Sequence, residues 1–273
     1  MRGYVDTAAG QVHFRREGDV GPAIVLLHCA NFNSNLYERT LPYLGDRMQA
    51  WAFDAPGVGL SDAPPEPTVP QIAQWLLEAL DALGIERPVV AGLHTGCRIA
   101  IQMIEIAGDD RFAAVVFSGI GPLSDEYRKA HPVNAPHLYL EPDAEGTQWM
   151  RAIERYRLIY PAENPPTEDR GWLQHLFALS SLSKVVPERL PWPGGPVEGV
   201  GLDPVFRAFS KPIYLYNTPE DLFSESDIDM ASWNPNAELN IVEGVGSHLM
   251  LREPKRYADD VFDFLERHGV LGS

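Results

Sequence analysis

The stretch VVAGLHTGCRIA, residues 89–100, combines two β-branched residues, a glycine-flanked turn and a helix-like continuation. Residues 92–96 follow the spacing G-x-H-x-G, in which the small glycines allow a sharp turn and close packing. In strand–turn–helix motifs with the spacing G-x-S-x-G, the central residue is a nucleophile exposed at the top of the sheet. The central residue here is His94. The stretch therefore predicts a turn of the kind that carries a nucleophile, with an imidazole where a hydroxyl is expected.

Apolar runs alternate with helix-like stretches on both sides of this turn, which is typical of a parallel sheet covered on both faces. The expected strands are residues 25–27, 51–53, 89–90, 114–117, 213–216 and 239–242, and the clearest helices are 33–45, 71–84 and 252–269. The alternation stops near Gly121, and residues 122–204 are instead rich in Pro, Trp, Arg and Glu, with two helical patches. We therefore expect an α/β core of residues 1–121 and 205–273, with residues 122–204 as an inserted helical lid.

Composition restricts the classes of partner. The chain has 273 residues, of which 45% are hydrophobic and 22% charged, and its net charge is -16. These are globular proportions, and the acidic charge argues against nucleic acid as a partner. The sequence shows neither a signal peptide nor a membrane-spanning run, and two cysteines do not make a disulfide framework. We expect a cytoplasmic protein with no membrane partner, and a homodimer remains open.

Five motifs occur in a fixed order along nearly the whole chain. They are VLLHCANF (25–32), FDAPGVGLSD (53–62), AGLHTGC (91–97), PIYLYNTPEDLF (212–223) and VEGVGSHLMLREP (242–254). In this order they resemble the α/β-hydrolase family. The resemblance implies an α/β fold with a mostly parallel central sheet flanked by helices, and a lid inserted after the first half. A shared fold does not by itself determine the chemistry.

The resemblance assigns a role to each motif. It places a catalytic acid at Asp221, a catalytic histidine at His248 and the nucleophile position at His94, in the chain order typical of the family. A carboxylate fixes the tautomer of an imidazole, so we expect Asp221 to bond to His248. The neighbouring Glu220 could supply the carboxylate instead, and either acid could cap the segment that follows.

The oxyanion of an ester-hydrolysis intermediate would be bound by backbone N–H groups of Ala30 and Thr95. Cys29 stands where the family usually has a glycine, and Cys97 stands where a second glycine often lies. Neither cysteine has an activating partner in the sequence, which favours small buried packing residues. In the turn that follows residue 53, a structural role is favoured for two further acids, Asp54 and Asp62.

His94 has four interpretations. It could be a covalent nucleophile that forms an acyl-imidazole, or it could act with His248 as a base and hydrogen-bond donor toward water or substrate. His94, His248 and a carboxylate could also bind a metal, or the site could have lost catalysis and kept only ligand binding. Because an imidazole occupies space where a substrate carbonyl would dock, we favour the base. No metal and no cofactor is expected.

Aromatic residues are frequent in residues 122–204 and suggest a pocket for a small apolar or aromatic molecule. Candidate pocket residues are Asn31, Trp149, Trp172 and His175. The expected function is cofactor-independent hydrolysis of an ester, a lactone or a C–C bond of a small carbonyl compound at His94, Asp221 and His248. The alternatives are a lyase, proton-transfer or oxygenase-type member of the fold, and a catalytically silent small-molecule-binding protein.

Overall fold

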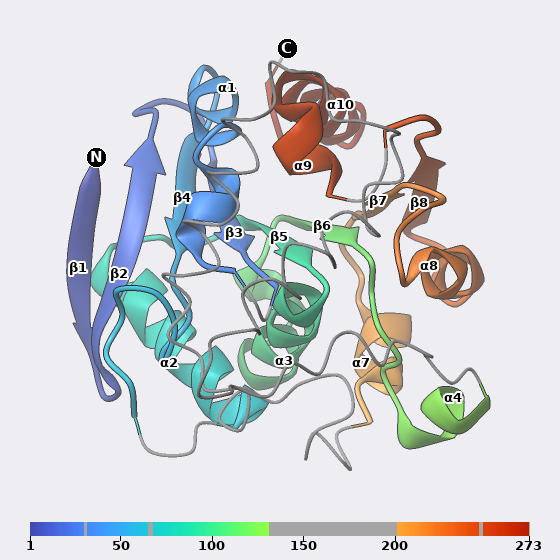
Figure 1. Ribbon diagram of the computed structural model, residues 1–273, viewed down its shortest axis with the longest axis horizontal. Helices are drawn as coiled ribbons and strands as arrows, with labels where there is room; N and C mark the ends of the chain where they lie inside the picture. The colour runs from blue at the N-terminus through green and yellow to red at the C-terminus, as the bar shows by residue number, and fades with distance from the viewer. Residues whose placement is uncertain (30–31, 65–67, 131–200, 246–247, 273) are drawn as a thin grey trace, which may run out of the picture.

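The computed structural model describes residues 1–29, 32–64, 68–130, 201–245 and 248–272. These residues form one eight-stranded sheet in the order β1-β2-β4-β3-β5-β6-β7-β8 (Figure 1). The strands are β1 (Arg2–Thr7), β2 (Gly10–Glu17), β3 (Ala23–Leu27), β4 (Gln49–Phe53), β5 (Val89–Leu93), β6 (Ala114–Ser118), β7 (Ile213–Asn217) and β8 (Ala237–Ile241). Strands β4, β3, β5, β6, β7 and β8 are parallel to one another, so the predicted α/β class with a mostly parallel sheet is confirmed.

Two strands at one end of the sheet lie outside the predicted pattern. β1 and β2 form an antiparallel hairpin, and β2 joins the parallel strands by antiparallel pairing with β4. The central prediction, that residues 213–216 join the sheet of residues 25–27, is confirmed, because β7 pairs with β6, β6 with β5 and β5 with β3. The chain therefore returns to the same sheet after residues 131–200, which lie outside the described residues.

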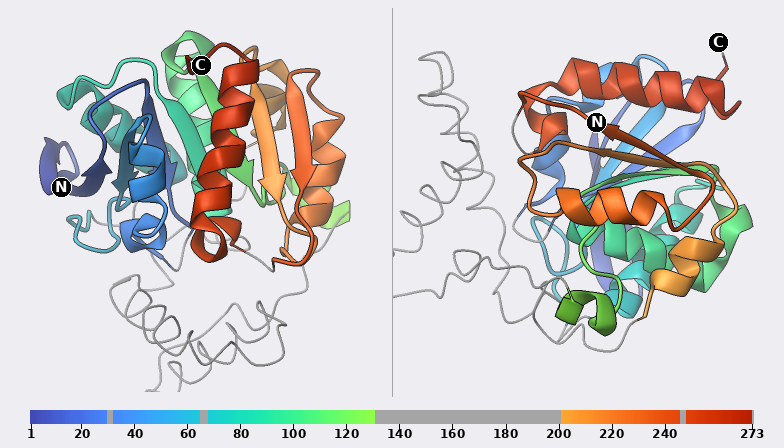
Figure 2. Two further views of the ribbon diagram at one scale, coloured as in Figure 1. Left: turned by 90° about the horizontal axis from the view of Figure 1, so that it is seen from above. Right: turned by 90° about the vertical axis from the view of Figure 1, so that its right-hand side faces the viewer.

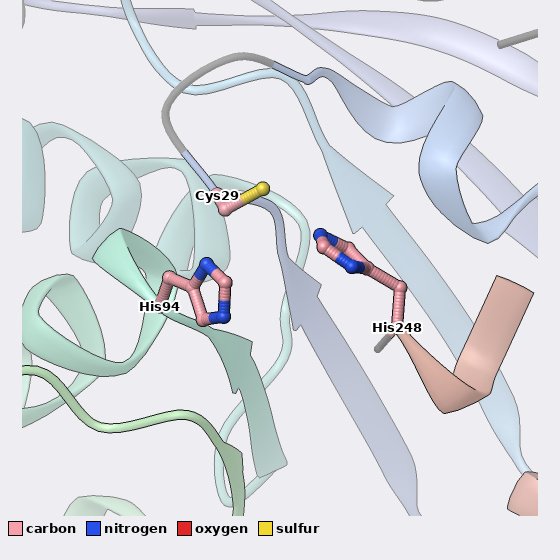
Figure 3. Close-up of side chains that lie close together, drawn as sticks. All are labelled: Cys29, His94 and His248. Atoms are coloured by element: carbon pink, nitrogen blue, oxygen red, sulfur yellow. The ribbon is translucent and has the colours of Figure 1, made fainter. Parts of the chain in front are cut away.

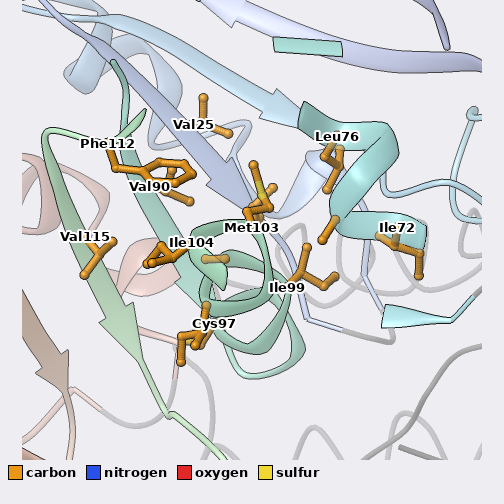
Figure 4. Close-up of a cluster of buried hydrophobic side chains, with 14 of the residues drawn as sticks. Val25, Ile72, Leu76, Val90, Cys97, Ile99, Met103, Ile104, Phe112 and Val115 are labelled. Carbon is orange, nitrogen blue, oxygen red and sulfur yellow. The ribbon is translucent and has the colours of Figure 1, made fainter. Parts of the chain in front are cut away.

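Each central strand buries both of its faces, which explains the continuous apolar runs. In β3, Val25 and Leu27 pack into one cluster of buried side chains, while Ile24 and Leu26 pack into a second cluster on the opposite face. The first face is covered by α2 (Val69–Ala82) and α3 (Thr95–Ala107), whose packing is shown in Figure 4. The second face is covered by α1 (Leu41–Gly45) and α10 (Pro254–Arg267), as Figures 1 and 2 show. The sheet is thus the middle of three layers.

The ends of the two long covering helices follow from local sequence. α2 begins with a capping box, in which the Thr68 side chain accepts the Gln71 backbone N–H and the Gln71 side chain accepts the Thr68 backbone N–H. α10 begins at Pro254 and is followed by Gly269 at φ 67°, a left-handed conformation that a glycine adopts without a steric penalty. The predicted stop at Gly269 is confirmed.

Several shorter helices lie beside the sheet. They are η1 (Ser34–Tyr37), η2 (Asp109–Arg111), α4 (Asp125–Ala130), α7 (Asp203–Ala208), α8 (Ser224–Ala231) and α9 (Leu249–Arg252). The stretch 33–45, expected to be helical, contains only η1 and α1. Among the residues described, no helix combines the length and the apolar character that crossing a bilayer requires. The two helical patches expected within residues 122–204 lie outside the described residues.

Candidate active site

The loops that follow the parallel strands meet at the carboxyl edge of the sheet, where ligands bind in open α/β folds. Cys29 lies two residues after β3, His94 directly after β5 and Gly119 directly after β6. Asp221 follows β7, and His248 follows β8 and immediately precedes α9. The sheet therefore brings together residues that are far apart in sequence.

The turn at His94 has the geometry of a strained elbow. His94 adopts φ 48° and ψ -107°, and its backbone N–H donates to the Ser118 carbonyl at 3.0 Å. A Cβ at position 92 would lie 2.6 Å from the Cys97 nitrogen, and one at position 96 would lie 2.1 Å from the Leu27 carbonyl oxygen. Both contacts are too short for any side chain larger than hydrogen, so the spacing G-x-H-x-G is a packing requirement. The elbow projects the imidazole over the carboxyl edge.

His94 is paired with Asp221. The distances from His94 Nε2 to the two carboxylate oxygens are 2.9 Å and 3.1 Å. The Asp221 side chain is fully buried and also accepts the Phe223 backbone N–H at 2.9 Å. Because an ionised carboxylate can only accept hydrogen bonds, Nε2 carries the proton and Nδ1 holds the free electron pair. The structure thus shows the Asp221 carboxylate bonded to His94, a pairing that the sequence did not predict, and His248 acts on the same carboxylate electrostatically.

The charge state of Asp221 follows from its surroundings. Burial acts to raise the pKa of Asp221, but the neighbouring His94 opposes it through its hydrogen bond and through the charge that its ring carries when it is protonated. Charge on His248 and the Phe223 N–H act in the same direction, so the pKa of Asp221 lies well below its ordinary value. Asp221 is therefore an anion, and it interacts electrostatically with both histidines. The alternative acid, Glu220, is exposed and does not enter the site.

His248 lies beside the His94 ring. It has φ 63° and ψ 55°, a left-handed conformation that is uncommon for residues other than glycine. Its ring centroid is 5.4 Å from that of His94 at an angle of 67°, and 5.7 Å from that of Phe32. The residue is almost fully buried, with 4% of its surface exposed. The expected proximity of the two imidazoles is therefore observed.

Cys29 completes the group that Figure 3 shows, in which three side chains point toward one another from separate loops. The Cys29 Sγ and one ring nitrogen of each of His94 and His248 all lie within 4.8 Å of one another. Both cysteines are buried, as expected. Cys29 packs in the apolar cluster on one face of the sheet, and its position beside the two imidazoles was not predicted from the sequence. Cys97 is fully buried in α3 and donates to the Gly92 carbonyl at 3.1 Å. Burial raises the pKa of the Cys97 thiol well above its usual value.

His28 holds the backbone beside Cys29 in place and was not among the residues selected from the sequence. The Ala55 N–H donates to His28 Nε2 at 3.0 Å, so the ring proton is on Nδ1 and donates to the Cys29 carbonyl at 2.8 Å. Burial lowers the pKa of His28, which keeps the ring neutral while it makes these two hydrogen bonds. The loop after β3 is thereby tied to the turn after β4.

Gly119 contacts the His94–Asp221 pair, and Asp227 holds the backbone of Gly119 in place. Gly119 has φ +69°, and a Cβ there would lie 2.4 Å from His94 Cδ2 and 2.7 Å from Asp221 Oδ1. The buried Asp227 carboxylate accepts the Gly119 and Ile120 backbone N–H groups at 2.8 Å and 2.7 Å and the Asn217 amide at 2.8 Å. Burial, and then the charge of Asp221, raise the pKa of Asp227 to about 8, although these donors oppose the shift.

Thr95 is the first residue of α3, so its backbone N–H has no acceptor within the helix and lies at the positive end of the helix dipole. An N–H in this position has no acceptor in the helix and can donate to a negatively charged ligand. The other expected donor, at Ala30, lies outside the described residues. So do the candidate pocket residues Asn31, Trp149, Trp172 and His175.

The two acids of the turn after β4 are structural, as expected. Asp54 accepts the Ser34 and Leu60 backbone N–H groups at 2.6 Å and 2.8 Å and bonds to His13 Nδ1 at 2.9 Å. Asp62 accepts the Gln11 backbone N–H at 2.8 Å. These bonds join the turn to β2 and η1 and leave neither acid available to the group around His94.

Known proteins resemble this chain in both sequence and fold. The sequence model of the family described as alpha/beta hydrolase fold matches residues 22–239. An uncharacterized carboxylesterase, nap, of Bacillus subtilis is 32% identical over 96 residues, which are 34% of this chain and 32% of that protein. The carboxylesterase YbfK of the same bacterium is 27% identical over 118 residues, which are 42% of this chain and 40% of that protein. The matched region thus spans about a third of the first relative and two fifths of the second.

Solved structures match over nearly the full length. The crystal structure of carboxylesterase CesB (YbfK) of Bacillus subtilis has a TM-score of 0.75 at 19% identity, covering 97% of this chain and 91% of that one. The esterase RhEst1 of Rhodococcus sp. ECU1013 has a TM-score of 0.79 at 20% identity, covering 98% of this chain and 99% of that one. At these identities the likeness concerns the arrangement of the backbone.

Proposed function

Since the chain belongs to the α/β-hydrolase fold family, we propose that it hydrolyses a small carboxylic ester or lactone, using His94, Asp221 and His248 and no serine nucleophile. The observation that carries the proposal is the Asp221–His94 hydrogen bond at the elbow, with His248 beside it. A carboxylate-oriented imidazole is the unit by which acyl-transfer enzymes activate a hydroxyl group or water. The carboxylesterases among the relatives of this chain support an ester as the substrate class.

The hydrogen-bond pattern supports His94 Nδ1 as the base. Because Asp221 holds the proton on His94 Nε2, Nδ1 is the atom that can accept a proton. A water molecule loses its proton to Nδ1 while its oxygen attacks the substrate carbonyl carbon. The resulting oxyanion is stabilised by the Thr95 N–H at the start of α3. The tetrahedral intermediate then collapses, the ester C–O bond breaks, and the leaving oxygen takes a proton from His94 or His248. The products are a carboxylic acid and an alcohol.

A non-covalent role for His94 is favoured by the position of its reactive atom. Nδ1 is bonded to Cγ, the ring carbon that is attached to Cβ. An acyl carbon that approaches Nδ1 therefore meets more steric hindrance than a water molecule does. The other ring nitrogen is occupied by Asp221. The Phe223 ring also packs edge-on against the His94 ring, with centroids 5.0 Å apart, and limits its rotation. Water activation therefore needs no rearrangement of the pair.

Rapid-quench mass spectrometry during turnover of aryl esters and lactones tests this role. We expect no substrate-derived mass on the wild-type protein, and a His94→Ala variant that keeps a small residual rate from His248 and the oxyanion donor. An adduct on the peptide containing residues 92–98, absent from His94→Ala, would show that His94 is a covalent nucleophile. Saturable binding of these compounds with no turnover by the wild-type protein would instead identify a binding protein.

A further inference from the structure

The side chains of Cys29, His94 and His248 bring one thiol and two imidazoles close together. Their ligand atoms lie within 4.8 Å of one another, and the three residues come from the loops after β3, β5 and β8. A tetrahedral zinc ion with Zn–S near 2.3 Å and Zn–N near 2.0 Å holds such atoms roughly 3.3 to 3.6 Å apart. Closing the group onto an ion therefore requires movements of about an ångström, within the reach of side-chain rotation.

The surroundings of His94 match those of a metal-bound histidine. Histidine ligands in metal sites commonly donate their second ring N–H to a carboxylate, which fixes the tautomer and strengthens the ligand. His94 makes this bond through Nε2 to Asp221 at 2.9 Å, which leaves Nδ1 with its electron pair as the ligand atom. The carboxylate is thus placed behind a ligand and need not touch the ion itself.

Charge balance also favours a divalent cation. Cys29 and His248 are 5% and 4% exposed, and the Asp221 side chain is fully buried, so an unbalanced charge in this group is costly. A +2 ion is balanced by two negative charges, the thiolate of Cys29 and the carboxylate of Asp221. Sulfur and imidazole ligands together select zinc and similar transition ions over magnesium or calcium.

We propose that Cys29, His94 and His248 bind one zinc ion, or a transition ion of similar chemistry, with Asp221 orienting His94. Three protein ligands leave a fourth position for water or another ligand, which is the pattern of open zinc sites. The proposal does not rest on the hydrolysis proposed above. When the ion is bound, both imidazoles use their free electron pairs to hold it. The hydrolysis proposed above therefore belongs to the metal-free form of the protein.

Cobalt(II) in place of zinc gives a direct readout of the ligands. The purified protein is stripped with a chelator and titrated with Co²⁺ without oxygen, followed by absorption spectroscopy. We expect one equivalent of Co²⁺ to produce the visible bands of a tetrahedral ion together with a thiolate-to-cobalt charge-transfer band in the near ultraviolet, and Zn²⁺ to displace it. The absence of these bands at saturating Co²⁺ would overturn the proposal.

The two cysteines of the chain provide a matched pair of variants. Cys29→Ser should lose the charge-transfer band, and Cys97→Ser should retain it, because Cys97 lies in the core and donates to Gly92 and Ser118. If Cys29→Ser fails to fold, as judged by circular dichroism, Cys97→Ser alone decides, since any thiolate band it keeps must come from Cys29. A band that survives in Cys29→Ser or disappears in a folded Cys97→Ser contradicts the proposal.

Zinc affinity, measured by competition with a chromophoric chelator, tests the role of Asp221. Asp221→Asn should weaken zinc binding by roughly 10- to 100-fold, the usual effect of removing the carboxylate partner of a histidine ligand. An unchanged affinity would show that Asp221 does not orient a ligand. The metal proposal and the proposed function can be refuted independently. Ester hydrolysis by a protein that binds no ion refutes only the metal proposal. Ion binding by a protein that does not hydrolyse esters refutes only the proposed function.

Discussion

His94 reaches Asp221 because an imidazole extends farther from the backbone than a hydroxymethyl group and carries two polar atoms on opposite sides of its ring. One nitrogen contacts the acid, and the other is directed away from it. Gly119 makes this possible, since any Cβ at that position would overlap both partners. The identity of the single residue at the elbow thus gives the buried carboxylate an imidazole as a hydrogen-bonding partner.

Asp221→Asn is predicted to lower the rate of ester hydrolysis by roughly 10²- to 10⁴-fold while leaving the fold intact. The amide has nearly the same shape, but it can donate to Nε2 and so favours the tautomer with the proton on Nδ1, which cannot act as a base. The comparison is made by steady-state kinetics on one aryl ester, with circular dichroism as the check on folding.

Glu220→Gln is the matched control, because it removes a carboxylate from the adjacent, exposed position. It should leave the rate within about twofold of wild type. A full rate in Asp221→Asn, or an equal loss in Glu220→Gln, would contradict the assignment of Asp221.

The sequence could predict where these side chains lie but not how they pair. The positions follow from strand order, because residues that come after parallel strands meet at one edge of the sheet. The pairing depends on side-chain length, ring orientation and the space at Gly119, none of which is encoded in a local pattern. The position of Cys29 beside the two imidazoles escaped prediction for the same reason, since it depends on how the loop after β3 folds.

At the scale of elements, the loop after β6 is held in place beside the His94–Asp221 pair by hydrogen bonds to α8. Asp227 of α8 binds the backbone N–H groups of Gly119 and Ile120, and the Asn217 amide at the end of β7 donates to the same carboxylate. The loop, the strand and the helix are therefore held as one unit behind the His94–Asp221 pair. A change in this unit should be transmitted directly to the pair.

Gly119→Ala is predicted to lower the free energy of unfolding by about 2 to 4 kcal/mol and to reduce activity strongly. The added methyl group would overlap His94 and Asp221, and the alanine backbone would also have to adopt a positive φ. Urea unfolding and ester kinetics measure the two effects.

Gly84→Ala separates crowding from backbone strain. Gly84 has the same φ of +69°, but a Cβ there meets nothing within 4 Å. We expect it to cost only about 1 kcal/mol and to leave activity unchanged. Equal losses of stability and activity in both variants would show that crowding at Gly119 plays no part.

The strands that the sequence revealed are those buried on both faces. β5 and β6 are buried at every position, so their apolar runs are continuous and easily recognised. The hairpin of β1 and β2 was not predicted, because β1 has a single buried residue, Val5, and contains polar residues and a glycine. Its pairing partner, β2, mixes buried polar residues such as His13 and Arg15 with apolar ones, so neither strand shows a clear pattern.

At the scale of the whole molecule, the sheet separates two apolar clusters and the turns bind its layers together. Asp54 is the clearest such connection, because its carboxylate bonds to His13 in β2, to Ser34 at the start of η1 and to Leu60 in the turn after β4. Burial would raise the pKa of Asp54, but these bonds outweigh it and lower the pKa to about 2. The stabilisation by Asp54 therefore requires its charge.

We predict that Asp54 makes part of the molecule's stability dependent on acid pH. Its folded pKa lies below the unfolded value near 4, so its contribution is complete above pH 4 and is lost as the pH falls toward 2. The shift corresponds to roughly 2 kcal/mol. Asp54→Asn should thus be less stable than wild type at pH 6, and the difference should shrink by about that amount between pH 4 and pH 2.

Urea unfolding at several pH values measures this difference, and Asp19→Asn, which alters an exposed carboxylate, is the control. The control should differ little from wild type at any pH. A stability difference for Asp54→Asn that stays constant from pH 6 to pH 2 would contradict the prediction.

The terminal strands of the sheet have a consequence for how copies of the molecule meet. Among the described residues β1 and β8 are the outermost strands, and each has an open row of backbone groups on which a foreign strand could assemble. β1 presents Arg2 and Asp6 to the surface, while Glu238 of β8 is paired with Arg267 of α10. Adding a strand at either edge would desolvate these charges. The ends of the sheet thus discourage the stacking of strands that begins fibrous aggregation, so any association between copies should use a helical or loop surface.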